Sequence, residues 1–114
     1  MELIERKYTI STSDLGDCFV YVTKFKDYVF DNIWIYRRVG EICFTDGRDT
    51  ASALDCFVPN WREDGTVEKI CKRYGCKMKG ENEELQASHG SQLIQAILAI
   101  YAWIEFSEPT IINY

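Results

Sequence analysis

The segment EICFTDGRDTASALDCF, residues 41–57, holds the residues of this chain whose types and spacing best suit chemistry. Asp46 and Asp49 stand three positions apart around an arginine, after an apolar run and before a helical pattern. Such carboxylates hold magnesium in nucleases when further acidic side chains join them. Asp31 would lie near Asp46 if their strands pair, and Glu41 precedes Asp46 on the same predicted strand. The sequence therefore leaves open a metal-dependent nuclease-like domain, or a degenerate one.

The same residues also suit a corner where a strand ends and a helix begins. Gly47 can adopt the positive φ that other residues avoid, and Asp46 before it is a frequent turn residue. Asp49 or Thr50 would be a suitable N-cap, because a short oxygen-bearing side chain accepts free amide N–H groups. A nuclease-like arrangement would also have a lysine two positions after the glutamate, where this chain has a cysteine. We therefore predict a structural corner, with no catalytic residue, no metal and no cofactor.

The cysteines and the single histidine offer little for catalysis. The cysteine count is odd, and no pair has the two-residue gap of a zinc knuckle. We expect reduced, partly buried thiols, as in cytoplasmic proteins. His89 directly precedes a predicted helix, where a histidine is usually a loop residue or a partial cap. The cysteines are Cys18, Cys43, Cys56, Cys71 and Cys76.

Charge points to a protein partner. A net charge of −5 argues against direct nucleic-acid binding through phosphate contacts. The charge is unevenly distributed, with an acidic block in residues 41–68 and five basic residues but no acid in residues 69–79. We predict that the acidic block meets a partner with a basic surface, and a homodimer stays open. The predicted contact residues are Glu41, Asp46, Asp49, Asp55, Glu63 and Asp64, with Trp61 as an anchor.

Aromatic side chains form the other candidate surface. If the first two predicted strands are neighbours, five rings would share one face of the sheet. That face would be core beneath the last helix, or a platform for stacked bases or a protein partner. A basic and aromatic pocket would suit a sponge for a signalling nucleotide, which remains a third functional alternative. The five residues are Phe19, Tyr21, Phe25, Trp34 and Tyr36.

Hydrophobic periodicity predicts an α+β fold. Residues 18–25 alternate as a strand does, residues 28–38 form a second strand, and a turn at Val39-Gly40 leads into a third at 41–45. The N-terminal residues add a possible edge strand, and two short strands flank a polar turn near residue 80. We predict a single domain over residues 1–114, with an antiparallel sheet of three to five strands and two or three helices.

Three helices follow from apolar spacing, turn residues and caps. One runs from Asp49 or Thr50 to Pro59, a second from Thr66 to Tyr74 with Gly75 as its C-cap, and a long apolar one starts at Ser91. The last helix should pack on the sheet. The predicted core residues are Val20, Val22, Ile33, Ile35, Leu54, Ile70, Leu93, Ile94, Ile97, Leu98 and Tyr101.

No apolar run reaches membrane-spanning length, since Gln92 and Gln95 interrupt the longest. The N-terminus is charged from its second residue and lacks a small-residue cleavage site, so we expect no signal peptide. Both observations predict a cytoplasmic protein that does not enter a membrane.

The order of these features resembles a bacterial and phage family catalogued as domain of unknown function eighteen-twenty-eight. The resemblance covers residues 15–104 and is most specific at Thr45-Asp46-Gly47 with Thr50, and at the run from Leu93 to Ala99. The chain departs from the family at Arg48, where a second acid is usual, and lacks much of the leading helix and the second domain of some members. The resemblance implies a small cytosolic protein of prophages and mobile elements.

Charge and resemblance together predict a function. We expect a small non-catalytic binding protein, an inhibitor of a host defence protein or complex, similar in role to anti-CRISPR proteins. The acidic charge and the absence of a complete catalytic set in the sequence favour this over the nuclease and the nucleotide sponge.

Overall fold

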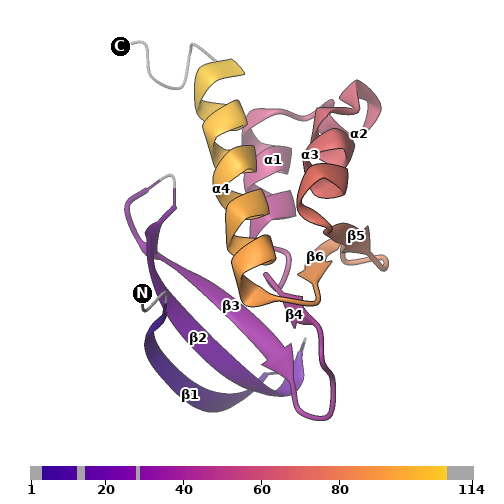
Figure 1. Cartoon of the computed structure of the whole chain (residues 1–114). Helices are drawn as coiled ribbons and strands as arrows, with labels where there is room; N and C mark the ends of the chain where they lie inside the picture. The colour runs from indigo at the N-terminus through magenta and orange to yellow at the C-terminus, as the bar shows by residue number, and fades with distance from the viewer. Residues whose placement is uncertain (1–3, 13–14, 28, 108–114) are drawn as a thin grey trace.

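The α+β class predicted from the sequence is that of the computed structural model, which describes residues 4–12, 15–27 and 29–107. Its strands form one antiparallel sheet, and its longer helices stack above one end of that sheet (Figure 1). The strands are β1 (Ile4–Thr12), β2 (Gly16–Lys26), β3 (Asn32–Arg38), β4 (Phe44–Thr45), β5 (Lys77–Lys79) and β6 (Glu84–Ala87). The helices are α1 (Asp49–Phe57), α2 (Trp61–Asp64), α3 (Thr66–Tyr74) and α4 (Gly90–Ser107).

The element count exceeds the prediction. Among the described residues, the sheet has six strands instead of three to five, and there are four helices instead of two or three. The predicted strand over residues 41–45 is reduced to the two residues of β4, and α2 is a single turn that leaves no periodic signal. The strand order is β1-β2-β3-β4-β6-β5, so β4 joins a long meander to a short second half.

The register of β2 against β3 separates the aromatic residues that the sequence placed together. Tyr21 lies opposite Ile35, while Val22 lies opposite Trp34 and Val20 opposite Tyr36. Antiparallel partners share a face, so Trp34 and Tyr36 lie on the face away from Tyr21. The prediction of one shared aromatic face is therefore wrong. The register shifts between Val22 and Lys26, and alternation within each strand reveals neither the register nor the shift.

Helix α4 covers the sheet face that carries Ile33 and Ile35, as predicted. Its buried residues, among them Leu93 and Ile97, form the main core together with α1, α3 and β6. Nine of the eleven predicted core residues are buried, whereas Ile70 and Leu98 are partly buried. In the described part of the chain, no helix is long and apolar enough to cross a membrane.

The corner after β4 is built around Asp46, which is only 1% exposed. Its Oδ1 accepts the N–H groups of Arg48 (3.0 Å) and Leu85 (2.9 Å), and its Oδ2 accepts that of Thr50 (2.9 Å). The predicted cap at Asp49 or Thr50 is therefore wrong: Asp46 satisfies the free amides at the start of α1 from three positions upstream. Gly47 has a φ of +68°, which confirms the expected turn glycine.

Candidate functional site: an acidic cavity at the start of α1

The acidic block does not form one continuous surface. Asp46 and Trp61 are buried, so neither is available to a partner on the outside of the molecule. Asp55 accepts a hydrogen bond from Trp61 Nε1 (2.9 Å) and pairs with Arg48 and Arg62. The carboxylate of Asp55 thus already has partners within the same chain.

The acidic block has three further predicted contact residues, Asp64, Glu63 and Glu41. Asp64 accepts the N–H of Thr66 at the start of α3 (3.1 Å), so it too serves the fold. Glu63 and Glu41 are exposed but lie on different elements, α2 and the loop before β4. Among the predicted contact residues, Asp46 and Asp49 line one cavity, and of these two only Asp49 is exposed.

This cavity, of about 580 Å³, opens between β3, α1 and α4. Its size lies within the range of ordinary ligand pockets. Four aspartates and one arginine supply its charged groups, and three aromatic rings supply much of the remaining wall. The residues used below are Arg6, Asp27, Asp31, Trp34, Tyr36, Asp46, Asp49, Thr50 and Tyr101.

Negative charge is concentrated at Asp49. Asp49 is exposed on one side, but the protein around its carboxyl excludes part of the water, and this loss of solvation, together with the nearby carboxylates of Asp46 and Asp27, raises its pKa to about 6. Burial also raises the pKa of Asp46, although the hydrogen bonds that it accepts act in the opposite direction. A group of carboxylates that repel one another in this way would be stabilised by a cation placed among them.

The aromatic walls present neutral hydrogen-bond donors beside these carboxylates. Burial, and then the charge of Asp49, raises the pKa of Tyr36 to about 12, and burial raises that of Tyr101 still further. Both phenols therefore stay protonated at neutral pH. Thr50 Oγ1 is fully buried and has no hydrogen bond of standard geometry, although Asp46 and Tyr101 both lie close enough to interact with it. A cation entering the cavity would meet carboxylates, aromatic rings and hydroxyl oxygens.

The loop at the cavity rim is unusual for its exposed apolar residues. We call Asp27, Val29, Phe30 and Asp31 the rim loop. Phe30 is 81% exposed and has a φ of +65°, a conformation that costs a bulky residue free energy. Asp27 Oδ1 accepts the N–H groups of Val29 and Asp31, and the Phe30 N–H donates to the Asp27 carbonyl, so the loop is held in this shape. A fixed, exposed aromatic residue is typical of protein-binding surfaces.

The carboxylates considered for a nuclease do not come together. Asp31 and Asp46 line the same cavity, but Glu41 lies beyond the other end of β3, where its N–H bonds to the Arg38 carbonyl. A strand of this length separates its ends by roughly 20 Å. Among the described residues, no group of three or more His, Cys, Asp or Glu side chains is arranged to hold a metal ion.

The aromatic residues on the other sheet face already have cationic partners. Lys7 Nζ lies 5.3 Å from the Phe19 ring centroid and 5.3 Å from that of Tyr21, and the Arg37 guanidinium lies 4.8 Å from the Phe19 centroid. A base stacking on Phe19 would compete with these contacts. Basic and aromatic side chains do meet here, as a nucleotide sponge would need, but the rings that they cover do not line the acidic cavity.

Sequence reasoning missed most of the cavity. It singled out Asp31, Asp46 and Asp49, and it named Trp34 and Tyr36 as part of a different surface. It did not identify Asp27, Tyr101 or Phe30 as site residues. The cavity walls come from β3, α1, α4 and the rim loop, which meet only through tertiary packing. One local signal was available: two aspartates bracket exposed apolar residues in the sequence KDYVFD, which interrupts a strand pattern.

Comparisons of the chain with protein-family models, with curated proteins and with solved structures found no match to any of them.

Proposed function

We propose that this protein is a non-catalytic binding protein that docks on a basic surface of another protein by taking a cationic side chain into the acidic cavity. The observation that carries the proposal is the convergence of Asp27, Asp31 and Asp49 with three aromatic rings on one cavity. Carboxylates attract a lysine or arginine, and aromatic faces stabilise its charge.

The rim loop supports a protein as the ligand, in preference to a small cation alone. Phe30 and Val29 are exposed and lie in the sequence between Asp27 and Asp31, two residues that line the cavity, so they offer an apolar contact area close to the charged one. Interfaces commonly combine a central aromatic anchor with charged groups around it. The strained φ of Phe30 would be retained because binding requires the ring in that place.

The finer part of the proposal is the role of inhibitor. The resemblance to a family of phages and mobile elements, the small size and the acidic charge favour a protein that blocks a host defence protein or complex in the cytoplasm. Defence proteins that handle nucleic acids carry basic surfaces, which an acidic cavity could cover.

Affinity capture with four baits tests the proposal: the parent protein, Phe30→Gly, Asp49→Asn and the control Glu63→Gln. The control removes the same charge as Asp49→Asn, but from α2, outside the cavity. We expect a host protein that is captured by the parent and the control and lost with both cavity variants. Purified, that host protein should lose its own activity when the parent is added.

Phe30→Gly also separates function from folding. Glycine adopts a positive φ without strain, so this variant should be at least as stable as the parent in urea unfolding. Equal capture by all four baits would contradict the proposal, and a captured protein whose activity is unaffected would contradict the inhibitor role.

A further inference from the structure

A second groove lies at the far end of the molecule, between α3 and the sheet edge. It has a volume of about 950 Å³ and shares no lining residue with the acidic cavity. Its lining includes Val67 and Cys71 of α3, Cys76 just before β5, and Met78 of β5. Burial raises the pKa of both thiols to about 11, so they are neutral, and with Val67 and Met78 they form an apolar part of the groove between charged side chains.

One side of this groove is an open strand edge. β5 is the last strand of the sheet and pairs only with β6. Within the described residues, the backbone of β5 makes no hydrogen bond outside that pair. Its outer N–H and C=O groups are therefore available to an added strand, which is a recurring mode of peptide recognition.

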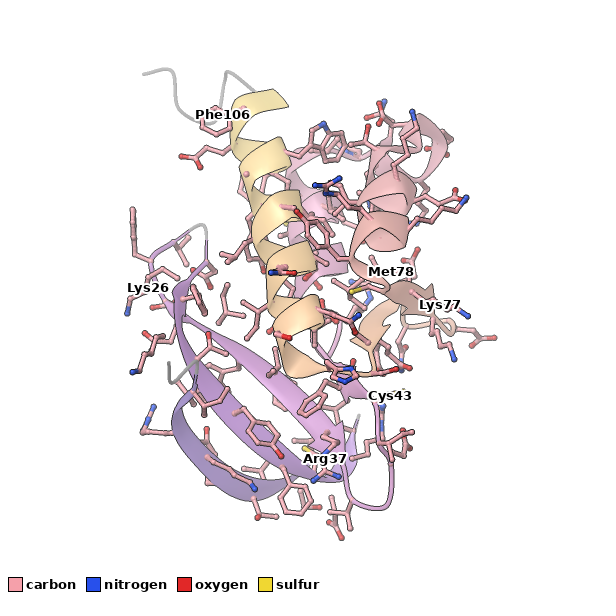
Figure 2. All side chains as sticks on the ribbon, viewed as in Figure 1. Lys26, Arg37, Cys43, Lys77, Met78 and Phe106 are labelled. Atoms are coloured by element: carbon pink, nitrogen blue, oxygen red, sulfur yellow. The ribbon has the colours of Figure 1, made fainter. Side chains whose placement is uncertain are left out.

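The rim of the groove is basic. Lys77 and Lys79 lie on β5 on either side of Met78, and neither is paired with a carboxylate in the described part of the chain. Figure 2 shows Met78 turned toward the helices and Lys77 pointing away from the body of the molecule. The acids that also line the groove are occupied: Glu83 pairs with Arg62, and Glu68 with Lys72.

The charges of Lys77 and Lys79 determine which kind of strand can pair with the open edge of β5. Antiparallel pairing of β5 with β5 of a second copy would place lysine against lysine, and like charges directly opposite destabilise a strand pair. An acidic strand would instead place carboxylates opposite Lys77 and Lys79, with its alternate side chains on the apolar groove. The open edge therefore favours an acidic partner over self-association.

We propose that this groove binds an extended acidic segment of a partner protein, which adds to the sheet as a strand alongside β5. Alternate apolar side chains of the segment contact Val67, Cys71 and Met78, and its carboxylates pair with Lys77 and Lys79. This surface is separate from the acidic cavity, so one copy of the protein could hold two segments of opposite charge.

The probe is a blocked, fluorescently labelled octapeptide of alternating glutamate and leucine, with a lysine and leucine peptide as its counterpart. We expect fluorescence anisotropy to show binding of the acidic peptide with a Kd below about 1 mM, and no binding of the basic one. The double variant Lys77→Glu and Lys79→Glu should weaken binding at least about tenfold. The matched control Lys7→Glu and Lys24→Glu carries the same charge change on β1 and β2 and should bind like the parent.

Amide NMR shifts locate the peptide. We expect bound peptide to shift the N–H signals of Lys77–Lys79 and to slow their hydrogen exchange. Absence of acidic-peptide binding, equal loss in both double variants, or shifts confined to other elements would each overturn the proposal. Asp49→Asn should leave this binding unchanged, so failure here and failure of the acidic-cavity proposal are separate results.

Discussion

Asp46 shows how a single carboxylate can be mistaken for a functional group. It lines a cavity, it is acidic, and its pKa is raised by burial. Its oxygens nevertheless accept three backbone N–H groups, two at the start of α1 and one on β6. Amides that would otherwise be buried without partners are satisfied by this one side chain.

Asp46→Ala should therefore destabilise the protein by about 3 kcal/mol or more, since it removes three hydrogen bonds to a charged acceptor. The matched control is Asp49→Ala, which removes a carboxylate from the same corner without an assigned backbone partner. We expect the control to unfold at the parent's urea concentration or slightly above it. Equal loss in the two variants would show that Asp46 does not hold the corner.

At the scale of elements, helix α4 contributes many of the buried residues of the main core. Ile97 is 1% exposed and lies on the helix face that packs against the sheet and α1. Ile97→Ala should cost about 2–5 kcal/mol, because it leaves a cavity that the surrounding residues fill only in part. Gln95→Ala changes an exposed position on the same helix and should stay within about 0.5 kcal/mol of the parent. A chemical denaturation series compares the two, and similar midpoints would contradict the packing of α4.

Elements with a periodic pattern and clear end signals were the predictable part of the fold. α3 runs from Thr66 to Tyr74 as expected, and Gly75 ends it with a φ of +70°. The strand that contains β4 was predicted, but its short length was not, and α2 was not predicted at all, because two residues or a single turn carry no period. The two sheet faces were assigned wrongly because alternation gives the sides of each strand but not its register with the neighbour. The cavity depends on that register, which places Trp34 and Tyr36 in its wall.

At the scale of the whole molecule, some acidic groups have a raised pKa and others a lowered one, and the two kinds affect stability at different pH values. The pKa of Asp49 is raised to about 6 by partial loss of solvation and by Asp46 and Asp27, so its folded form binds a proton that the unfolded chain releases near pH 4. Its contribution to stability is present below about pH 4 and is lost as the pH rises through 6. Asp55 and Glu83 have lowered pKa values because they accept hydrogen bonds from Trp61 and Arg62, respectively. Their contribution to the stability of the protein is therefore lost only when the pH falls below about 4 and they become protonated.

Unfolding free energy should therefore increase as the pH falls from 7 to 5, and decrease again below about 4. Asp49→Asn should raise stability at pH 7 and flatten the change between pH 7 and 5, because the repulsion among Asp49, Asp46 and Asp27 is then absent at both values. Denaturant titrations of both proteins at several pH values between 7 and 4 measure the unfolding free energy. Parallel pH profiles for the parent and Asp49→Asn would contradict the assignment. The other charged and titratable groups at the cavity are Arg6, Asp31, Tyr36 and Tyr101.

The hydrogen bond between Asp46 and Leu85 has a consequence for the order of folding. β1, β2 and β3 pair with strands that are adjacent in the sequence, whereas Asp46 meets Leu85 across 39 positions of chain. Closing the longer loop costs more chain entropy, so the meander should form early and β6 should join it late. Contacts made after the transition state affect the unfolding rate more than the folding rate. Loss of the Asp46 carboxylate should therefore shorten the lifetime of the native protein while leaving its rate of formation nearly unchanged.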